Sequence, residues 1–203
     1  MTRLIIVRHG ETEWNRVERF RGQYDIPLNQ TGISQAEKSA KFIATYWKPA
    51  AVYSSPLTRA MATAEAIAAI NQLTVQPHPQ LIDIHYGDWQ GLTPEEVRLH
   101  WNEQAKNWYE HPELAQIPNG ETLIQVQQRA MQAVREICTL YPTQDVVLVS
   151  HTVVNRLILL AMVGAGIDRF WHIRQEPCAV NVVEATEQDF TIISVNDICH
   201  LRS

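Results

Sequence analysis

Two runs of consecutive apolar, mostly β-branched residues stand out along the chain, and a histidine comes two residues after each run. Residues 4–7 are entirely apolar and are followed by Arg8 and His9. Residues 146–149 are also entirely apolar, and His151 follows them. Uninterrupted apolar runs of this length are typical of strands buried in a parallel sheet, and open α/β sheets bind ligands at the carboxyl ends of their strands. We therefore expect both histidines at one edge of one sheet.

Between these strands, apolar residues recur with the 3.6-residue period of an amphipathic helix. The first such helix is expected to have Thr31 or Ser34 as its N-cap, and Pro49 marks its expected end. The other expected elements are helices that open at Pro56, span 123–141 and end near Val163, short strands at 51–55 and 73–75, and an antiparallel pair at 179–185 and 190–195. The pattern predicts an α/β fold, namely a three-layer α/β/α sandwich whose mostly parallel sheet has an antiparallel edge.

Residues 93–120 interrupt this alternation with a segment rich in helical signals, tryptophan and proline. Thr93 and Pro94 followed by two glutamates are a typical helix start. We interpret the segment as a small helical cap, inserted into a single domain that spans residues 1–203. Such a cap is expected to shield a site at the sheet edge from bulk water.

The composition and net charge of the chain limit the kinds of molecule that it is expected to bind. The 203 residues carry a formal net charge of -5, with a pI near 5.9, which argues against a nucleic acid or an anionic membrane surface as partner. Arg16, Arg19 and Arg21 nevertheless gather close to Arg8, which indicates either a local pocket for an anionic substrate or a solvated charged loop. Three cysteines without metal-ligand spacing favour a reducing, cytoplasmic compartment, and we expect neither a signal peptide nor a membrane span.

The residues after the first strand carry the first chemical motif. A guanidinium at Arg8, an imidazole at His9 and a glycine at Gly10 suit a phosphate group that is attacked by a ring nitrogen, although a solvated strand end would give the same tripeptide. Residues 4–15 as a whole resemble the signature of the histidine phosphatase superfamily, the phosphoglycerate mutase-like proteins. The resemblance implies that His9 is the nucleophile that becomes phosphorylated, that Arg8 clamps the phosphate, and that Asn15 is a further phosphate contact.

Two more segments match motifs of this family. Residues 54–60, Ser-Ser-Pro-Leu-Thr-Arg-Ala, resemble its second motif and imply that Arg59 is a second guanidinium on the same phosphate. Ser150 and His151 resemble its serine-histidine motif, which makes His151 the second imidazole at the phosphate. Arg59 and Thr152 both lie at expected helix starts, where free backbone N–H groups favour anions, and Thr152 is expected to offer its backbone N–H.

The family places its general acid, usually a glutamate, at the position of Asp83. An acid is needed because an alkoxide is a very poor leaving group at neutral pH. Aspartate is shorter by about 1.5 Å of reach, and a loop-capping role is the alternative. The resemblance also implies substrate contacts outside the phosphate for Arg21 and Gly22, and for His85, which otherwise would be a packed or solvated imidazole.

The same resemblance favours hydrolysis over mutase chemistry. Mutases of the family carry Glu-Arg at the acid position and arginines in the cap, whereas this chain has Asp83-Ile84 and no arginine in residues 111–118. The subgroup it most resembles is the metal-independent phosphoserine phosphatases, because it shares His85, residues 150–153, Phe170-Trp171 and Cys199-His200-Leu201. This resemblance implies no metal and no cofactor, and a small phosphorylated metabolite, L-phosphoserine, whose carboxylate would meet Arg21, His85 or His200.

Several rivals remain open. An α-ribazole phosphatase or a broad-specificity sugar-phosphate phosphatase would share the catalytic residues, and a phosphoglycerate mutase or a non-catalytic phosphate-binding module is less favoured. A metallohydrolase built from His9, His85, His151 and Asp83 lacks a helical ligand pair that would support it. The apolar residues of 192–201 are compatible with a homodimer formed through a sheet edge.

Overall fold

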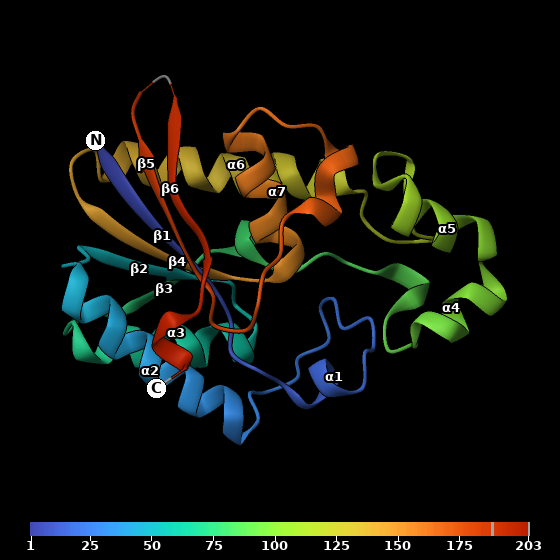
Figure 1. Cartoon of the computed structure of the whole chain (residues 1–203), viewed down its shortest axis with the longest axis horizontal. Coiled ribbons are helices and arrows are strands. Elements are labelled where there is room, and N and C mark those ends of the chain that lie inside the picture. The colour runs from blue at the N-terminus through green and yellow to red at the C-terminus, as the bar shows by residue number, and fades with distance from the viewer. Residues whose placement is uncertain (188, 203) are drawn as a thin grey trace.

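The part of the chain that the structure describes forms a six-stranded sheet (Figure 1). The structure is a computed structural model that describes residues 1–187 and 189–202, including the main chain but not the side chain of Arg16. In the strand order β3-β2-β4-β1-β5-β6, the first four strands are parallel, and β5 and β6 are each antiparallel to the strand before them. The strands are β1 (Thr2–Arg8), β2 (Ala51–Ser54), β3 (Val75–Pro77), β4 (Asp145–Ser150), β5 (Val180–Ala185) and β6 (Phe190–Asp197).

Helices cover both faces of this sheet, which confirms the predicted three-layer α/β fold. Helices α2 and α3 pack on one face and α6 and α7 on the other, each pair in its own hydrophobic cluster. The α-helices are α1 (Glu13–Arg16), α2 (Gln30–Tyr46), α3 (Thr58–Ile70), α4 (Pro94–His100), α5 (Asn102–Glu110), α6 (Leu123–Leu140) and α7 (Thr152–Met162). The 3₁₀ turns are η1 (Pro79–Leu81), η2 (Gly87–Trp89), η3 (Pro112–Leu114), η4 (Ile167–His172) and η5 (Cys199–Leu201).

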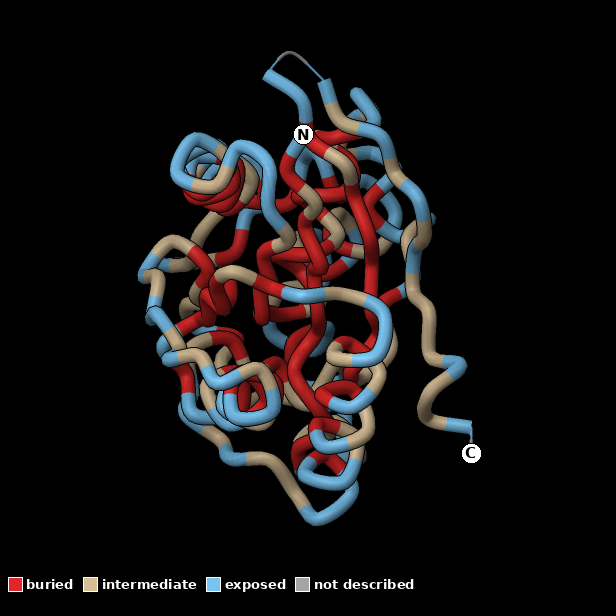
Figure 2. Tube along the Cα trace, turned by 90° about the vertical axis from the view of Figure 1, so that its left-hand side faces the viewer, coloured by how far each residue is buried: buried red, intermediate tan, exposed pale blue. Residues whose placement is uncertain are grey.

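The central strand β1 is apolar at every inner position because it is buried on both faces. Leu4 and Ile6 pack with α6 and α7, whereas Ile5 and Val7 pack with α2 and α3, as the alternation of side chains along a strand requires. Figure 2 shows these buried segments running through the middle of the molecule, with exposed residues around them. The burial of both faces leaves the strand ends as the places where polar groups can gather.

Two helix starts differ from the prediction. Helix α3 begins at Thr58 with Leu57 as its N-cap, so Pro56 precedes the helix and does not open it. Helix α2 begins at Gln30, so its N-cap is Asn29 and not Thr31 or Ser34. The reason is that the Asn29 side-chain oxygen accepts a hydrogen bond from the main-chain N–H of Gly32 at 2.8 Å, which satisfies a free donor of the first turn. The helix ends at Tyr46 with Trp47 as its C-cap, shortly before Pro49, which the sequence marked as its end.

Residues 93–120 contain α4, α5 and η3, and these helices stand at one end of the molecule beside the α1 loop (Figure 1). Trp108 of α5 is buried and contacts the rings of Tyr86, Trp89 and Phe170, so this helical unit is anchored to the main body by aromatic packing. Of the helices in the described ranges, none is long and apolar enough to cross a membrane.

Candidate active site

The two histidines meet at the carboxyl edge of the sheet because their strands are neighbours. Arg8 at the end of β1 is in register with Ser150 at the end of β4, and the His9 main-chain N–H donates to the Ser150 carbonyl at 2.9 Å. The ring centroids of His9 and His151 are 5.1 Å apart. The structure thus brings together two imidazoles that lie more than a hundred positions apart in the sequence.

The hydrogen bonding of His9 leaves one ring nitrogen available as a nucleophile. Its Nδ1 lies 2.7 Å from the carbonyl oxygen of Gly10, and because a carbonyl only accepts, Nδ1 carries the proton and Nε2 keeps its lone pair. Burial lowers the pKa of His9 well below 6.5, and the charges of Arg59, Arg8 and Arg21 lower it further. The ring is therefore neutral at physiological pH, as a nucleophile must be.

Three arginines surround this histidine with an excess of positive charge. Arg8 is 7% exposed and Arg59 is fully buried. Arg8 donates to the carbonyl of Gln175 at 2.6 Å, while Arg59 donates to the carbonyls of Tyr24 and Gly22. Burial and nearby Arg21 lower the pKa of Arg8 to about 9, because both disfavour the charged form of its guanidinium. The Nε atoms of Arg8, Arg21 and Arg59 are buried without a hydrogen-bond partner among the described residues, which suits the binding of a dianion.

Asp83 lies beside Arg59 and His151, two residues after η1, and is 6% exposed. One carboxylate oxygen accepts the Ile84 main-chain N–H at 3.0 Å, and the other accepts from Arg59 at 3.2 Å and lies 3.6 Å from His151 Nδ1. Burial raises the pKa of Asp83, although Arg59 and Arg21 act in the opposite direction. A carboxyl group with a raised pKa at this position can hold the proton that a leaving oxygen needs.

His151 is fully buried between Asp83 and a serine that the sequence motif also contained. Its Nε2 lies 2.7 Å from the Ser55 hydroxyl oxygen, and its pKa is lowered by burial and by Arg59. Ser55 was not among the predicted site residues. It directly follows β2, so three parallel neighbours each deliver a polar group to the same edge.

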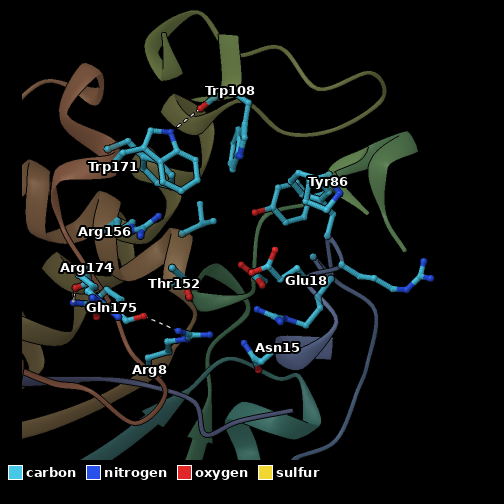
Figure 3. A pocket seen from close by; sticks show the side chains of 18 of the residues that line it. Arg8, Asn15, Glu18, Tyr86, Trp108, Thr152, Arg156, Trp171, Arg174 and Gln175 are labelled. Carbon is cyan, nitrogen blue, oxygen red and sulfur yellow. Dashed lines mark hydrogen bonds between the residues drawn. The ribbon is translucent and has the colours of Figure 1, made fainter. Parts of the chain in front are cut away.

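Arg8, His9 and Asp83 line a cavity of ≈ 430 Å³ (Figure 3), whereas the fully buried Arg59 and His151 are not among its lining residues. The inner end holds Arg8, His9 and Asp83, and the outer wall is largely aromatic. The aromatic wall comes from α5, from η4 and from the loops that carry Phe20 and Tyr86. Figure 3 shows Trp108 and Trp171 on one side of the cavity and Tyr86 on the other. The aromatic residues are Phe20, Tyr86, Trp108, Tyr109, Phe170 and Trp171.

Four of the other predicted site residues line this cavity, namely Asn15, Arg21, Gly22 and Thr152. The Asn15 side-chain oxygen accepts from both the main-chain N–H and the hydroxyl of Thr12 at 2.9 Å, so its amide N–H groups remain as donors. Gly22 has φ +51, where a side chain would be strained, and this turn aims its carbonyl at Arg59. Thr152 is the first residue of α7.

Two predicted substrate contacts do not reach the cavity. His85 is not among the lining residues, because its Nδ1 accepts the main-chain N–H of Gly87 at 3.1 Å and the ring is held in that turn. His200 lies against α2, where its ring stacks on Phe42 with centroids 4.7 Å apart and its Nε2 is 2.9 Å from the Ser39 hydroxyl. The geometry therefore gives neither histidine a contact with a ligand in this cavity.

Two of the three arginines of the predicted electropositive loop are found at the cavity. Arg19 and Arg21 line the cavity, whereas the Arg16 side chain lies outside the described part of the structure. Sequence reasoning missed Glu18 and Arg156, which also line it. A signal existed for Arg156, since it comes four residues after Thr152 and so shares its helix face.

Within residues 1–187 and 189–202, no three histidine, cysteine, aspartate or glutamate side chains cluster in a way that could hold a metal ion.

Comparison with known proteins gives a consistent picture. The family model described as "Histidine phosphatase superfamily (branch 1)" matches residues 4–198. Phosphoserine phosphatase 1 of Hydrogenobacter thermophilus is 34% identical over 201 residues, which cover 99% of this chain and 95% of that protein. The metal-independent phosphoserine phosphatase of Arabidopsis thaliana is 34% identical over 205 residues, which cover 100% and 84%. Among solved structures, Bacillus stearothermophilus YhfR aligns with 99% of this chain and 100% of its own, with a TM-score of 0.95 and 30% identity.

Proposed function

The chain belongs to the histidine phosphatase superfamily, branch 1, and on this premise we propose that it is a metal-independent phosphoserine phosphatase that releases L-serine and phosphate. The observation that carries the proposal is the neutral His9, whose free Nε2 lies beside two buried guanidiniums, a third that is partly buried, and one carboxyl group. The two relatives named as phosphoserine phosphatases support the choice of substrate.

In the first step, His9 Nε2 attacks phosphorus in line with the serine oxygen, forming the N–P bond as the P–O bond breaks. Arg8, Arg59 and His151 stabilise the charge on the equatorial phosphoryl oxygens. Asp83 gives its proton to the departing serine oxygen. Its raised pKa supports this role, and the incoming phosphate dianion raises that pKa further because like charges disfavour ionisation.

In the second step, Asp83 acts as the carboxylate. It takes a proton from a water molecule, the water oxygen attacks the phosphohistidine, and the N–P bond breaks to restore His9 and release phosphate. Asp83 ends the cycle protonated, ready for the next substrate. The same carboxyl group thus serves as acid and then as base.

The outer cavity supports a substrate whose leaving group carries charges of both signs. Glu18 and Glu176 line it together with Arg156 and Arg174. L-Serine carries an ammonium group, which the glutamates can pair with, and a carboxylate, which the arginines can pair with.

A second candidate is favoured by one observation, the six aromatic side chains around the cavity. Such a wall also suits a flat aromatic substituent, as in α-ribazole phosphate, or a broad range of phosphomonoesters.

The deciding experiment compares kcat/KM for L-phosphoserine, α-ribazole phosphate, 3-phosphoglycerate and p-nitrophenyl phosphate, all in EDTA. The proposal expects L-phosphoserine to be preferred and turnover to persist in the chelator. A preference for another of these esters would contradict the substrate assignment, and loss of turnover in EDTA would contradict the metal-independent mechanism.

We also propose that the protein works in the cytoplasm and forms a homodimer. The three cysteines are unpaired, as is usual in a reducing compartment. Strand β6 is at the edge of the sheet and exposes Ile193 and Val195, which favours pairing with a second copy. Light scattering would test the dimer, and a monomer at micromolar concentration would contradict it.

A further inference from the structure

Arg156 is a cavity-lining guanidinium to which the phosphate chemistry gives no role. It lies on α7 one helical turn after Thr152, at a separation of about 6 Å along the helix axis. Figure 3 shows Thr152 between Arg8 and Arg156 on one wall of the cavity, with Glu18 and Tyr86 opposite. Arg156 is therefore positioned for a second group of the ligand that binds phosphate at Arg8.

The position of Arg156 is fixed by its neighbours. Its Nε donates to the carbonyl of Ile173 at 2.6 Å. Its guanidinium lies over two rings of η4, with its central carbon 5.1 Å from the centroid of Phe170 and 4.8 Å from that of Trp171. Stacking and one hydrogen bond hold the planar group, while its Nη groups remain as donors beside the cavity.

The charge of Arg156 is not compensated by the protein around it. Among the described residues, no carboxylate lies within ion-pair distance of Arg156, in contrast to Arg59 with Asp83 and Arg174 with Glu176. Burial lowers the pKa of Arg156, which is the mark of a cation held partly out of water. A preorganised, desolvated guanidinium without a counter-ion is suited to bind an anionic group of a ligand.

We propose that Arg156 binds the carboxylate of the substrate and makes the enzyme select phosphomonoesters of hydroxy acids. The inference rests on the proposed function, and it assigns to Arg156 the contact that the sequence had suggested for Arg21, His85 or His200. Phosphate at Arg8 and a carboxylate at Arg156 hold the two ends of one small molecule. Arg156 is a specificity-determining residue, and it takes no part in bond breaking.

The test measures kcat and KM for two pairs of esters that differ by a carboxylate. L-Phosphoserine is compared with phosphoethanolamine, and 3-phosphoglycerate with 2-hydroxyethyl phosphate. The Arg156→Gln variant is expected to lose about 10- to 100-fold in kcat/KM for the carboxylate-bearing ester of each pair, mainly through KM, and to change within about twofold for its partner. Equal losses within a pair, or no loss for either acid, would overturn the inference.

Arg169→Gln is the matched control, because Arg169 lies on η4, pairs with Asp168 at 3.0 Å and is not a cavity residue. It changes the net charge equally and should leave both ratios unchanged; a similar loss in this variant would mean a general charge effect and would also overturn the inference.

If Arg156→Gln does not fold, Arg156→Lys keeps the charge without the planar fork, and the acid of each pair should still lose more than its partner. A wild-type enzyme that hydrolyses 3-phosphoglycerate but not L-phosphoserine would contradict the proposed function, while the second pair would still test Arg156.

Discussion

The charge state of single buried residues decides whether this site can do its chemistry. Asp83 is subject to opposing effects, because burial raises its pKa while the guanidiniums of Arg59 and Arg21 lower it. Burial has the larger effect, so the carboxyl group is closer to neutrality than an exposed aspartate would be. His9 and His151 are shifted the other way and are held neutral. The site thus pairs a carboxyl group that holds a proton more readily with imidazoles that resist protonation.

The acid role of Asp83 predicts an effect that depends on the leaving group. Asp83→Asn should lower kcat for L-phosphoserine by about 10²- to 10⁴-fold, because an alkoxide needs a proton. Phosphorylation of the enzyme by p-nitrophenyl phosphate should be much less affected, since p-nitrophenolate leaves unaided. Single-turnover kinetics separate the two steps. Asp83→Glu is the matched variant and should retain more activity than Asp83→Asn; equal losses of the phosphorylation rate for both esters would contradict the acid role.

The buried histidines predict how stability depends on pH. Since folding lowers the pKa of His9 and His151 below 6.5, the unfolded chain binds more protons than the folded chain at lower pH. The free energy of unfolding should therefore fall as pH drops below about 6.5, while Asp83 acts in the opposite direction above its usual pKa of 3.8. Urea denaturation from pH 5 to 8 measures the slope. His151→Gln should reduce this slope by up to the contribution of one proton bound on unfolding. An unchanged slope would rule out a buried neutral His151.

At the scale of elements, the N-terminus of α2 supports the loop that carries His9. A Cβ built on Gly32 would lie 2.1 Å from the Glu11 carbonyl oxygen, and one built on Gly10 would lie 2.5 Å from the Gly32 carbonyl oxygen. Only two glycines allow the helix and the loop to approach this closely. The Gly10 carbonyl also fixes the proton of His9 on Nδ1, so packing between these elements sets the state of the nucleophile.

Gly32→Ala should therefore damage both stability and turnover. The added methyl group forces the loop away, which should cost about 1–3 kcal/mol of unfolding free energy. It should also lower kcat by about 10- to 100-fold through misplacement of His9. Urea denaturation and steady-state kinetics measure the two effects. Thr31→Ala, on the exposed side of the same turn, should change neither, and a fully active Gly32→Ala would show that this contact does not position His9.

At the scale of the whole molecule, the sequence predicts the inner site better than the outer cavity. Arg8, His9 and His151 lie at or just after the carboxyl ends of two apolar strands. Because these strands are parallel neighbours, their carboxyl ends meet irrespective of how the other segments pack. The outer wall depends on how α5 and η4 pack against the sheet, which no local pattern specifies. Glu18 lies in the loop after α1, where no periodic pattern marked it, whereas the helical spacing of Arg156 from Thr152 was a signal that was not used. His85 and His200 were expected to meet the substrate, but Gly87 and Phe42 hold them elsewhere.

The most direct test of the account is to trap the phosphorylated enzyme. Asp83→Asn mixed with p-nitrophenyl phosphate should release one equivalent of p-nitrophenolate in a burst and then stall, because the base that activates water is missing. Peptide mass spectrometry after an alkaline quench should locate one phosphoryl group on His9, labile to acid, and the double variant with His9→Ala should show neither burst nor adduct. Turnover without any adduct on His9, or an adduct on another residue, would contradict a mechanism in which His9 attacks the phosphate.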